Sequence, residues 1–577
     1  MELLDSRRLT GPGLLLDGPG AVIDAAAPPA EAGALAAAWS ERIRRVLDAL
    51  GWAGAQVAAQ VHAGGASLAF AAPPDALYAA TEVNEWAFDA AVAAVRGEPE
   101  PPLAEAAERL RARVDAERSP RLLALRAAAA RAGVAFLPDD DTVSVGMGGG
   151  SLAWPVDALP DADAVDWARV RDVPTALVTG TNGKTTTVRL VAAMAAAAGR
   201  AAGFASTDEV VVGGRVVDRG DFSGPMGARQ VLRDPGVEMA VLETARGGIL
   251  RRGLVIAQAD VALVTNVSAD HLGEFGVYDM DALAAAKLLV ARAVRPGGRV
   301  VLNAEDPVLV AAAPTLRSAI TWFAMDRSAP KVREAVMEGA RAVFVENGKF
   351  VLAHGAERIP LGFVAEAPVT MGGAARHNVA NALAAIGVAD ALGLGERAIA
   401  AGLRSFGTAP GENAGRGEVL ELGGAKVLVD FAHNPAAVAA LVHMAAAIPA
   451  DRRLVLLGQA GDRDDDAIRD LVRSASALMP DRVVVKEMLG LLRGRQPGEI
   501  PALVRDELLR DGVPDDAIDF YAPTELDGVR RALAWVRAGD LLVLPIHKQR
   551  PAVEALLAQL RGTGWTAGDP LPEPAPD

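Results

Sequence analysis

The chain has 577 residues, of which 51% are hydrophobic and only 4% aromatic, so aliphatic and alanine side chains must supply most of the core. Lys and Arg number 58 against 73 Asp and Glu, a formal net charge of −15. No dense basic patch of the kind that binds nucleic acid occurs in the sequence. Cysteine is absent, which excludes disulfides, thiolate catalysis and cysteine-bound zinc and fits a reducing compartment.

The N-terminal sequence MELLDSRRLTGPG lacks the apolar core of a signal peptide. No apolar run approaches the roughly 20 residues that a membrane span needs. We therefore expect a cytoplasmic protein that binds neither nucleic acid nor membrane. At about 100–200 residues per domain, the length predicts three or four domains.

Residues 1–165 carry the weakest signals. Two stretches rich in Ala, Arg and Leu predict helices over 104–118 and 121–132, and Ser119–Pro120 separates them. A hairpin is expected next, with its turn at Gly148–Gly150. We interpret this part as an α+β N-terminal domain, and substrate binding is the working hypothesis for its role.

From Pro174 onward, buried strands alternate with helices, and the strands read TALVTG, MAVLET, DVALVTNV and GRVVLNAED. This alternation predicts an α/β domain with a parallel sheet over 166–407. The same alternation resumes after TAPGENAGRG and predicts a smaller, Rossmann-like α/β domain over 408–562. The Pro- and Asp-rich segment 563–577 is predicted to be a disordered tail.

The strongest local motif is TGTNGKTTT at Thr179–Thr187, where a strand leads through a glycine loop into a helix expected from Lys184 to about Ala198. Backbone N–H groups and a helix N-terminus together form a cradle for phosphate. Lys184 is then expected to reach the terminal phosphates and the Thr185 hydroxyl to bind Mg²⁺. The common pattern has glycine where this chain has Val178. The loop alone is compatible with a ligase, a kinase, a transport ATPase or a switch protein.

Three later residues are candidates for the same site. Glu243 ends the strand MAVLE, where a carboxylate can hold Mg²⁺ or cap a helix. His271 follows the strand DVALVTNV and fits either a structural role or a metal ligand. Lys287 lies in the apolar helix LAAAKLLV, where a lysine requires an explanation.

Six motifs occur in the order found in Mur ligases, and the chain resembles that family. They are TGTNGKTTT, LETARGGILR, NVSADHLG, the helix with Lys287, HNVANALAAIG (377–387) and VDFAHNP (429–435). The resemblance is closest to the Mur-ligase half of the cyanophycin synthetases. It extends to the segments 205–225, NAEDP (303–307), GDRDDD (461–466) and LRGRQPGEI (492–500). The ATP-grasp domain that precedes this half in those enzymes has no matching motifs in residues 1–165.

The resemblance implies an ATP-dependent amide ligase that activates a carboxylate as an acyl phosphate and couples it to an amino-acid amine. It implies that Glu243 binds Mg²⁺, that His271 supports a second metal ion, and that Lys287 is carbamylated and helps to position that ion. The implied metal set is Thr185, Glu243, His271 and Lys287.

The resemblance also implies nucleotide contacts from two domains. Asn381 is expected against the nucleotide base, Arg416 at the phosphates, and Asp430 and His433 as ATP contacts from the C-terminal domain. The expected nucleotide-binding residues are Gly180, Thr181, Asn182, Gly183, Lys184, Thr185, Thr186, Asn381, Arg416, Asp430 and His433. The expected catalytic set is Lys184, Glu243, His271, Lys287 and Arg416.

The expected substrates are an amino acid and a carboxylate acceptor that is a peptide or another amino acid. Candidates for reading the amine are Asp462, Arg463, Arg493 and Arg495. The acidic run Asp464–Asp466 either faces a basic amine or forms a solvated loop or helix cap. His547 and Lys548 have no assigned role.

Several functional alternatives stay open on the sequence alone. The acceptor is also compatible with a poly-γ-glutamate, a specialised metabolite or a peptidoglycan precursor. A further alternative is a nucleotide-binding scaffold that partners a separate ATP-grasp protein. A homo-oligomer is left open.

Overall fold

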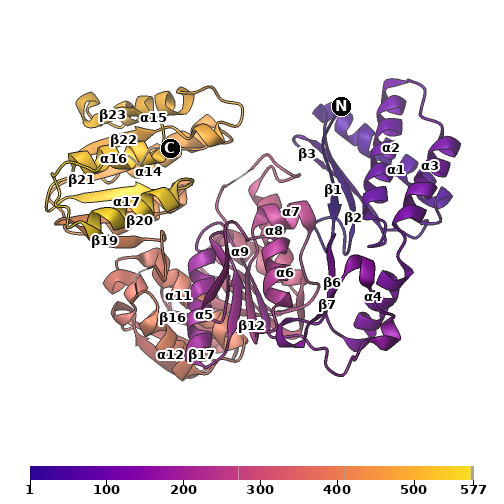
Figure 1. Ribbon diagram of the computed structural model, residues 1–577, viewed down its shortest axis with the longest axis horizontal. Coiled ribbons are helices and arrows are strands. Elements are labelled where there is room, and N and C mark those ends of the chain that lie inside the picture. The colour runs from indigo at the N-terminus through magenta and orange to yellow at the C-terminus, as the bar shows by residue number, and fades with distance from the viewer. Residues whose placement is uncertain (271, 410, 574–577) are drawn as a thin grey trace. The chain divides into compact units, whose positions relative to one another are not determined.

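The computed structural model describes residues 1–270, 272–409 and 411–573, and the chain forms two compact units (Figure 1). The first unit comprises Met1–Gly362 and Ala380–Leu403, and the second comprises Phe363–Val379 and Arg404–Asp577. The predicted α/β class is confirmed, because parallel strands dominate the central sheet and its C-terminal counterpart.

The first unit begins with a four-stranded antiparallel sheet in the order β1-β2-β4-β3. Its core is built on Trp39 and Phe70, and buried Asn84 bonds both the Trp39 indole (2.9 Å) and the Leu68 carbonyl (3.1 Å). The elements are β1 (Glu2–Leu9), β2 (Gly20–Ala26), α1 (Pro29–Ala49), β3 (Val57–His62), β4 (Gly65–Ala71), α2 (Leu77–Arg96) and α3 (Leu103–Glu117).

A helix and a small sheet follow. Helix α4 (Pro120–Ala132) begins at the predicted break, where the Ser119 hydroxyl accepts the Leu122 N–H at 3.3 Å. The predicted hairpin is confirmed, because β6 (Thr142–Val145) pairs antiparallel with β7 (Leu152–Pro155) and Gly148–Gly150 forms the turn. Strand β5 (Phe136–Pro138) completes this sheet.

An eleven-stranded sheet forms the centre of the first unit, in the order β11-β10-β9-β12-β8-β13-β14-β15-β16-β17-β18. Its middle strands are buried along their whole length, as is typical of a parallel sheet with helices on both faces. The strands are β8 (Thr175–Thr179), β9 (Ala202–Ala205), β10 (Glu209–Val212), β11 (Arg215–Arg219), β12 (Met239–Glu243), β13 (Ala259–Val264), β14 (Val294–Asn303), β15 (Ala319–Ala324), β16 (Arg341–Glu346), β17 (Lys349–His354) and β18 (Glu357–Phe363).

Helices connect these strands. The helix predicted from Lys184 is confirmed as α5 (Lys184–Ala197). The others between strands are α6 (Pro225–Arg233), α7 (Arg246–Arg252), α8 (Met280–Arg292), α9 (Pro307–Ala312) and α10 (Pro330–Met337). Helices α11 (Arg376–Ala391), which begins in the second unit, and α12 (Glu396–Ser405) follow β18.

The second unit has a six-stranded sheet in the order β19-β20-β24-β21-β22-β23, parallel except for β19. Helices cover both faces of this sheet, and a separate apolar cluster lies between the sheet and the helices on each face. The elements are β19 (Glu418–Leu422), β20 (Ala425–Asp430), α13 (Pro435–Ala446), β21 (Arg453–Leu457), α14 (Asp465–Ser476), β22 (Arg482–Lys486), α15 (Glu499–Arg510), β23 (Ile518–Ala522), α16 (Glu525–Trp535), β24 (Leu541–Pro545) and α17 (Arg550–Gly562).

Two segments differ from the expected boundaries. Residues 363–379 belong to the second unit, because buried Ala375 joins the apolar cluster of Leu428 and Leu441. The prediction of a disordered tail from 563 is wrong for residues 563–573. Trp565 is buried there, and the Ala567 N–H donates to the Gly423 carbonyl at 2.9 Å.

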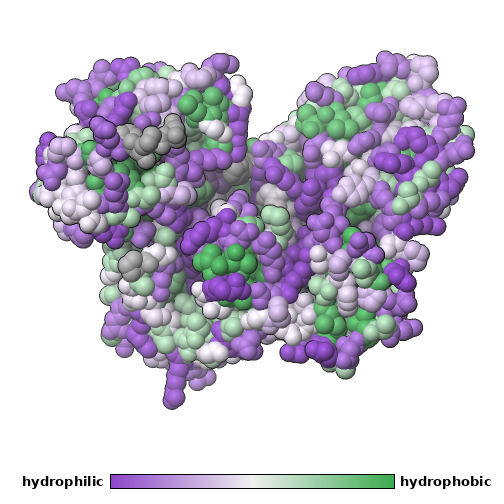
Figure 2. All heavy atoms as spheres, in the orientation of Figure 1, coloured by the Kyte–Doolittle hydropathy of each residue, from purple (hydrophilic) through white to green (hydrophobic). Residues whose placement is uncertain are grey.

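No helix among the described residues is long and apolar enough to cross a membrane. The face of the molecule drawn in Figure 2 is mostly hydrophilic, with small hydrophobic patches between the polar residues. This surface agrees with a chain in which 23% of residues are charged.

Asp306 in the NAEDP segment links two neighbouring parts of the central sheet. One carboxylate oxygen accepts the Val267 N–H at 2.6 Å, and the other caps α9 by accepting the Val308 and Leu309 N–H groups at 3.0 and 3.1 Å. Asp306 is buried. The segment that follows β13 is therefore tied to the start of α9.

Replacing Asp306 should destabilise the first unit in a graded way. Asp306→Ala removes both the helix cap and the acceptor of a buried N–H, so we expect the free energy of unfolding to fall by about 1–3 kcal/mol. Asp306→Asn keeps one acceptor oxygen and should lose less. The urea midpoint, which is the urea concentration at which half of the first unit is unfolded, should be lowest for Asp306→Ala, intermediate for Asp306→Asn and highest for the unchanged chain. The exposed Asp326→Ala should change the midpoint little, since water replaces its contact with Ser328. Equal midpoints for Asp306→Ala and the unchanged chain would contradict the linking role.

Candidate nucleotide and metal site

The glycine loop begins two residues later than the common phosphate-loop pattern. Val178 is still part of β8, paired with Glu243 of β12 on one side and Leu263 of β13 on the other. The chain turns at Gly180, whose φ is +144°. A Cβ there would lie 1.9 Å from the Thr265 hydroxyl, so only glycine fits. Valine at 178 is accommodated because the strand has not yet ended.

A second loop holds the glycine loop in shape. The Thr181 N–H donates to the Asn266 carbonyl at 2.9 Å, and the Asn182 N–H donates to the Asn266 side chain at 3.0 Å. Thr265 donates its hydroxyl to the Asn182 carbonyl at 2.6 Å. The Thr181 hydroxyl and the Ser268 backbone exchange two further bonds of 3.0 and 3.1 Å. The residues after β13 thus shape the glycine loop, which the sequence analysis treats as a strand–loop–helix motif alone.

Lys184 stands at the start of α5. Its ammonium group donates to the carbonyls of Gly180 and Thr181 at 3.1 and 3.0 Å, so it lies over the loop. Gly183, with φ +86°, is the N-cap of the helix. A Cβ at Gly183 would lie 2.1 Å from the Asn381 side-chain oxygen, which places the buried Asn381 directly beside the loop. Its predicted contact with the nucleotide base stays a prediction.

Thr185 and Glu243 bring two side-chain oxygens together. The Thr185 hydroxyl donates to Glu243 Oε2 at 2.8 Å, and the Thr207 hydroxyl donates to Oε1 at 2.6 Å. Neighbouring oxygens in a Mg²⁺ octahedron with 2.0–2.1 Å bonds are about 2.9 Å apart. The spacing and chemistry of Thr185 and Glu243 therefore fit Mg²⁺. Thr207 was not assigned from the sequence, although it lies in the 205–225 segment.

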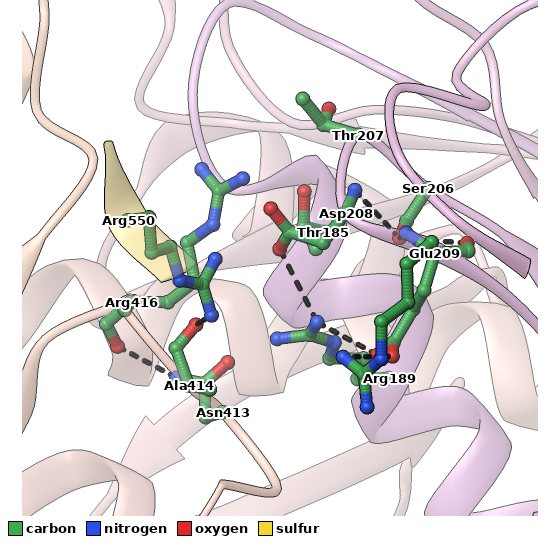
Figure 3. Close-up of polar contacts among 12 residues, drawn as sticks. Thr185, Arg189, Ser206, Thr207, Asp208, Glu209, Asn413, Ala414, Arg416 and Arg550 are labelled. Atoms are coloured by element: carbon green, nitrogen blue, oxygen red, sulfur yellow. Dashed lines mark hydrogen bonds and ion pairs between the residues drawn. The ribbon is translucent and has the colours of Figure 1, made fainter. Parts of the chain in front are cut away.

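The loop that carries Thr207 is anchored to α5 by an ion pair (Figure 3). Buried Arg189 of α5 contacts Glu209 at 2.8 Å and Asp208 at 3.2 Å. The Ser206 hydroxyl accepts the Asp208 and Glu209 N–H groups at 3.3 and 3.2 Å. These contacts fix the backbone of Thr207 beside Glu243.

Lys287 is buried in α8. Burial and the positive charge of Lys184 lower the pKa of Lys287 to about 7, the charge of Arg246 adds to this effect, and Asp270 opposes it. A lysine with this pKa is about half neutral at pH 7 and becomes largely a neutral, nucleophilic amine as the pH rises further. The lysine that requires an explanation in the apolar helix is thus a buried one, and its expected carbamylation stays a prediction.

His271 lies outside the described residues, and its predicted metal role stays a prediction. The next residues are held to the first unit by Arg246 of α7, which contacts Glu274 at 2.8 Å. Among the described residues, no three His, Asp or Glu side chains lie close enough together to hold a metal ion.

The second unit carries the remaining predicted residues. Asp430 is the last residue of β20; burial raises its pKa, and the nearby His377 and Arg416 oppose that shift. The Arg416 guanidinium lies 4.6 Å from the centre of the Phe431 ring. His433 Nδ1 is 3.0 Å from the Phe431 carbonyl. Asp430, Arg416 and His433 are therefore neighbours through Phe431.

Arg416 belongs to a turn braced from α17. Figure 3 shows Arg550 directed at the Ala414 carbonyl, to which it donates at 2.5 Å. The Asn413 side chain donates to the Arg416 carbonyl at 2.7 Å. These bonds hold the backbone on both sides of Gly415.

The acidic run at 464–466 is a helix start. Asp464 is the N-cap of α14 and accepts the Ala467 N–H at 2.7 Å. Asp466 pairs with Arg469 at 2.9 Å in the same helix, and Asp465 pairs with Arg495 at 2.8 Å. The helix-cap alternative is confirmed.

Comparison with known proteins confirms the resemblance to Mur ligases. Cyanophycin synthetase of Synechocystis sp. is 36% identical over 387 residues, which are 67% of this chain and 44% of that protein. The chain thus spans less than half the length of that relative. UDP-N-acetylmuramate–L-alanine ligase of Acidithiobacillus ferrooxidans is 28% identical over 63% of this chain and 72% of that enzyme. The crystal structure of MurF from Acinetobacter baumannii is 20% identical, with a TM-score of 0.48, over 68% of this chain and 77% of that one.

Two family models match consecutive parts of the chain. Residues 178–389 match the Mur ligase middle domain, and residues 415–545 match the Mur ligase glutamate ligase domain. The first match contains the glycine loop, Glu243 and Lys287, and the second contains Arg416, Asp430 and His433. Through these two domains the chain belongs to the Mur ligase family.

Proposed function

We propose that this protein is an ATP-dependent amide ligase that joins an acceptor carboxylate to the amine of an amino acid. The observation that carries the proposal is the Thr185–Glu243 pair, with its 2.8 Å spacing, directly beside Lys184 at the start of α5. A phosphate cradle together with an oxygen pair that fits Mg²⁺ is what γ-phosphoryl transfer from ATP requires.

The reaction has two steps. A carboxylate oxygen attacks the γ-phosphorus of ATP, the bond to the β-phosphate oxygen breaks, and ADP and an acyl phosphate form. The amine then attacks the carbonyl carbon, the carbon–oxygen bond to phosphate breaks, and the amine loses a proton as inorganic phosphate leaves. Activation is needed because a carboxylate alone offers only oxide as a leaving group.

The residues of the chain contribute charge and orientation. Lys184 is placed to neutralise charge on the transferring phosphoryl group, as electrostatic stabilisation of phosphoryl transfer requires. Thr185 and Glu243 would hold Mg²⁺, which when bound screens the β- and γ-phosphate oxygens. Arg416, Asp430 and His433 are proposed as the nucleotide contacts of the second unit, and Asn381 as a contact of the base.

The proposed substrates follow from the relatives. Cyanophycin synthetase and the muramate–alanine ligase support an amino acid as the amine donor. The acceptor is proposed to be a peptide or amino-acid carboxylate bound with the help of residues 1–165. The proposal places the reaction in the cytoplasm.

Lys287 is proposed to be carbamylated. Its neutral amine adds to the carbon of CO₂, one proton is released, and a carbamate anion forms. The conversion replaces a buried lysine with an anion that can support the second metal ion together with His271. The pKa of about 7 favours the step, because only the unprotonated amine has a lone pair.

A panel of acceptors and amines tests the proposed function. Wild-type protein is supplied with Mg²⁺-ATP, the amino acids, and β-Asp-Arg, γ-glutamyl or muramyl peptides. We expect release of ADP and phosphate that depends on one acceptor–amine pair, with a product heavier than the acceptor by the amine minus water. ATP hydrolysis whose rate does not depend on the acceptor or the amine, or release of AMP in place of ADP, would contradict the proposal.

Lys184→Ala and Glu243→Gln should each lower turnover with the active pair by about 10²–10³-fold, because the first removes a cation beside the transferring phosphate and the second weakens the hold on Mg²⁺. ADP release measures the loss, and circular dichroism checks that the fold is kept. Lys331→Ala and Glu334→Gln are matched controls, since this pair lies on α10 at the surface. Wild-type turnover in both site variants would refute the site.

Lys287 should bind CO₂ in a pH-dependent way. With ¹³C-bicarbonate, a carbamate signal is expected by NMR at pH 8 and should fade as the pH falls below about 7, where the amine becomes protonated. Lys287→Met should lack the signal and Lys331→Met should keep it. Lys287→Ala should lose turnover and regain part of it with acetate. A signal and turnover unaffected by Lys287 replacement would show that the lysine is only structural.

A further inference from the structure

Lys486, Glu525 and His547 meet in the second unit, although they come from three separate segments. Lys486 ends β22, Glu525 begins α16, and His547 follows β24. The Lys486 ammonium is fully buried and donates to Glu525 Oε1 and to the Pro545 carbonyl, both at 2.6 Å. Its third near neighbour is His547 Nδ1 at 3.4 Å. A lysine has three N–H donors, and this arrangement provides an acceptor for each.

Glu525 fixes the turn that carries His547. Its carboxylate accepts the backbone N–H groups of His547, Lys548 and Gln549 at 2.8, 2.7 and 2.7 Å. Burial alone would raise the pKa of Glu525, but the nearby His547 side chain and the charge of Lys486 outweigh it and hold the pKa well below its usual range. The buried carboxylate is therefore an anion with its charge compensated.

The tautomer of His547 follows from the contacts of its two ring nitrogens. Nε2 is 3.0 Å from the Ala432 carbonyl, which can only accept, so Nε2 carries the proton. Nδ1 lies 3.4 Å from both the Lys486 ammonium and Glu525 Oε1; because a neutral ring with its proton on Nε2 has none on Nδ1, Nδ1 offers its lone pair to the ammonium. Burial and the charge of Lys486 lower the pKa of His547 to about 4 against the influence of Glu525. The ring is neutral at physiological pH and donates to Ala432.

Ala432 lies in the loop of residues 431–434, whose other carbonyls are also held. The His433 carbonyl accepts the Gln459 side-chain N–H at 2.8 Å. The Phe431 carbonyl accepts from His433 Nδ1 at 3.0 Å, which gives His433 the Nδ1–H tautomer. Asn434 ends the loop by capping α13 through the Ala437 N–H at 2.9 Å. Bonds to three successive carbonyls thus hold the backbone of this loop, and the first of them, at Phe431, orients the His433 ring.

We propose that Lys486, Glu525 and His547 are positioning residues that fix the loop 431–434, and through it His433, for nucleotide binding. The inference rests on the proposed function, in which His433 contacts ATP. The chain of contacts runs from the Lys486 ammonium to His547 Nδ1, and from His547 Nε2 to the Ala432 carbonyl. Glu525 anchors both members of that chain.

Two substitutions at His547 distinguish the effect of losing the N–H donor to Ala432 from the effect of losing the imidazole ring. His547→Leu removes the bond to Ala432, whereas His547→Gln has a side-chain N–H that can reach the same carbonyl. We expect His547→Leu to raise KM for ATP about tenfold, with a much smaller change in kcat, because one positioning bond is lost outside the reacting atoms. His547→Gln should restore most of the affinity. Lys331→Met, on the surface of α10, is the control for Lys486→Met, which should behave like His547→Leu.

Hydrogen exchange provides a readout that does not depend on catalysis. The amides of peptides spanning 431–437 should exchange faster in His547→Leu and Lys486→Met, and at the wild-type rate in His547→Gln. Two results would overturn the inference. One is an unchanged exchange rate at 431–437 together with unchanged ATP affinity in His547→Leu. The other is faster exchange throughout the second unit, because that would show a merely structural role. Wild-type protein that binds no ATP would refute the proposed function, while local exchange at 431–437 would still report whether the three residues hold the loop.

Discussion

The parallel pairing of β8 with β12 on one side and β13 on the other is the constraint on which the first unit's site depends. It brings the ends of three strands to one edge of the sheet, where Glu243, the glycine loop and the Thr265–Ser268 segment meet. Ligands bind at this edge of open parallel sheets because the loops there leave the strands in the same direction. A shift of β12 by one residue would turn the Glu243 side chain to the other face of the sheet and remove it from Thr185.

Much of this arrangement could be predicted from the sequence, because the signals are local. A buried strand, a glycine loop and a following helix can be read from TALVTGTNGKTTT, and α5 begins at the expected Lys184. The buried run MAVLE likewise predicts that Glu243 stands at the end of a strand. Lys287 was recognised because a lysine in an apolar helix is unusual, and it is buried.

The rest of the site depends on contacts between distant segments, which carry no local signal. Asn266 and Thr265 clamp the glycine loop through bonds across more than 80 positions of the chain. Thr207 reaches Glu243 because Arg189 holds Asp208 and Glu209, the two residues that follow Thr207, and nothing in either segment alone predicts that pair. The same is true of Trp565, which packs against the second unit although its surroundings are rich in Pro and Asp.

The two units use buried charge in different ways. Burial and the positive charge of Lys184 lower the pKa of Lys287, with Asp270 opposing and Arg246 adding to the shift, so the charged form of this lysine is disfavoured. Lys486 faces the Glu525 carboxylate at 2.6 Å and two further acceptors, so its charge is used to hold a fixed turn. Burial lowers the pKa of both lysines, but the carboxylate of Glu525 opposes that shift at Lys486, whereas the charge of Lys184 adds to it at Lys287.

Transfer of a carboxylate oxygen to phosphate tests the central claim most directly. The acceptor that supports ADP release is prepared with ¹⁸O in its reacting carboxylate, and the released phosphate is analysed by mass spectrometry. An acyl phosphate intermediate predicts one acceptor ¹⁸O in each phosphate, because the carbon–oxygen bond breaks when the amine attacks. Unlabelled phosphate, or label in AMP, would contradict activation by γ-phosphoryl transfer at this site.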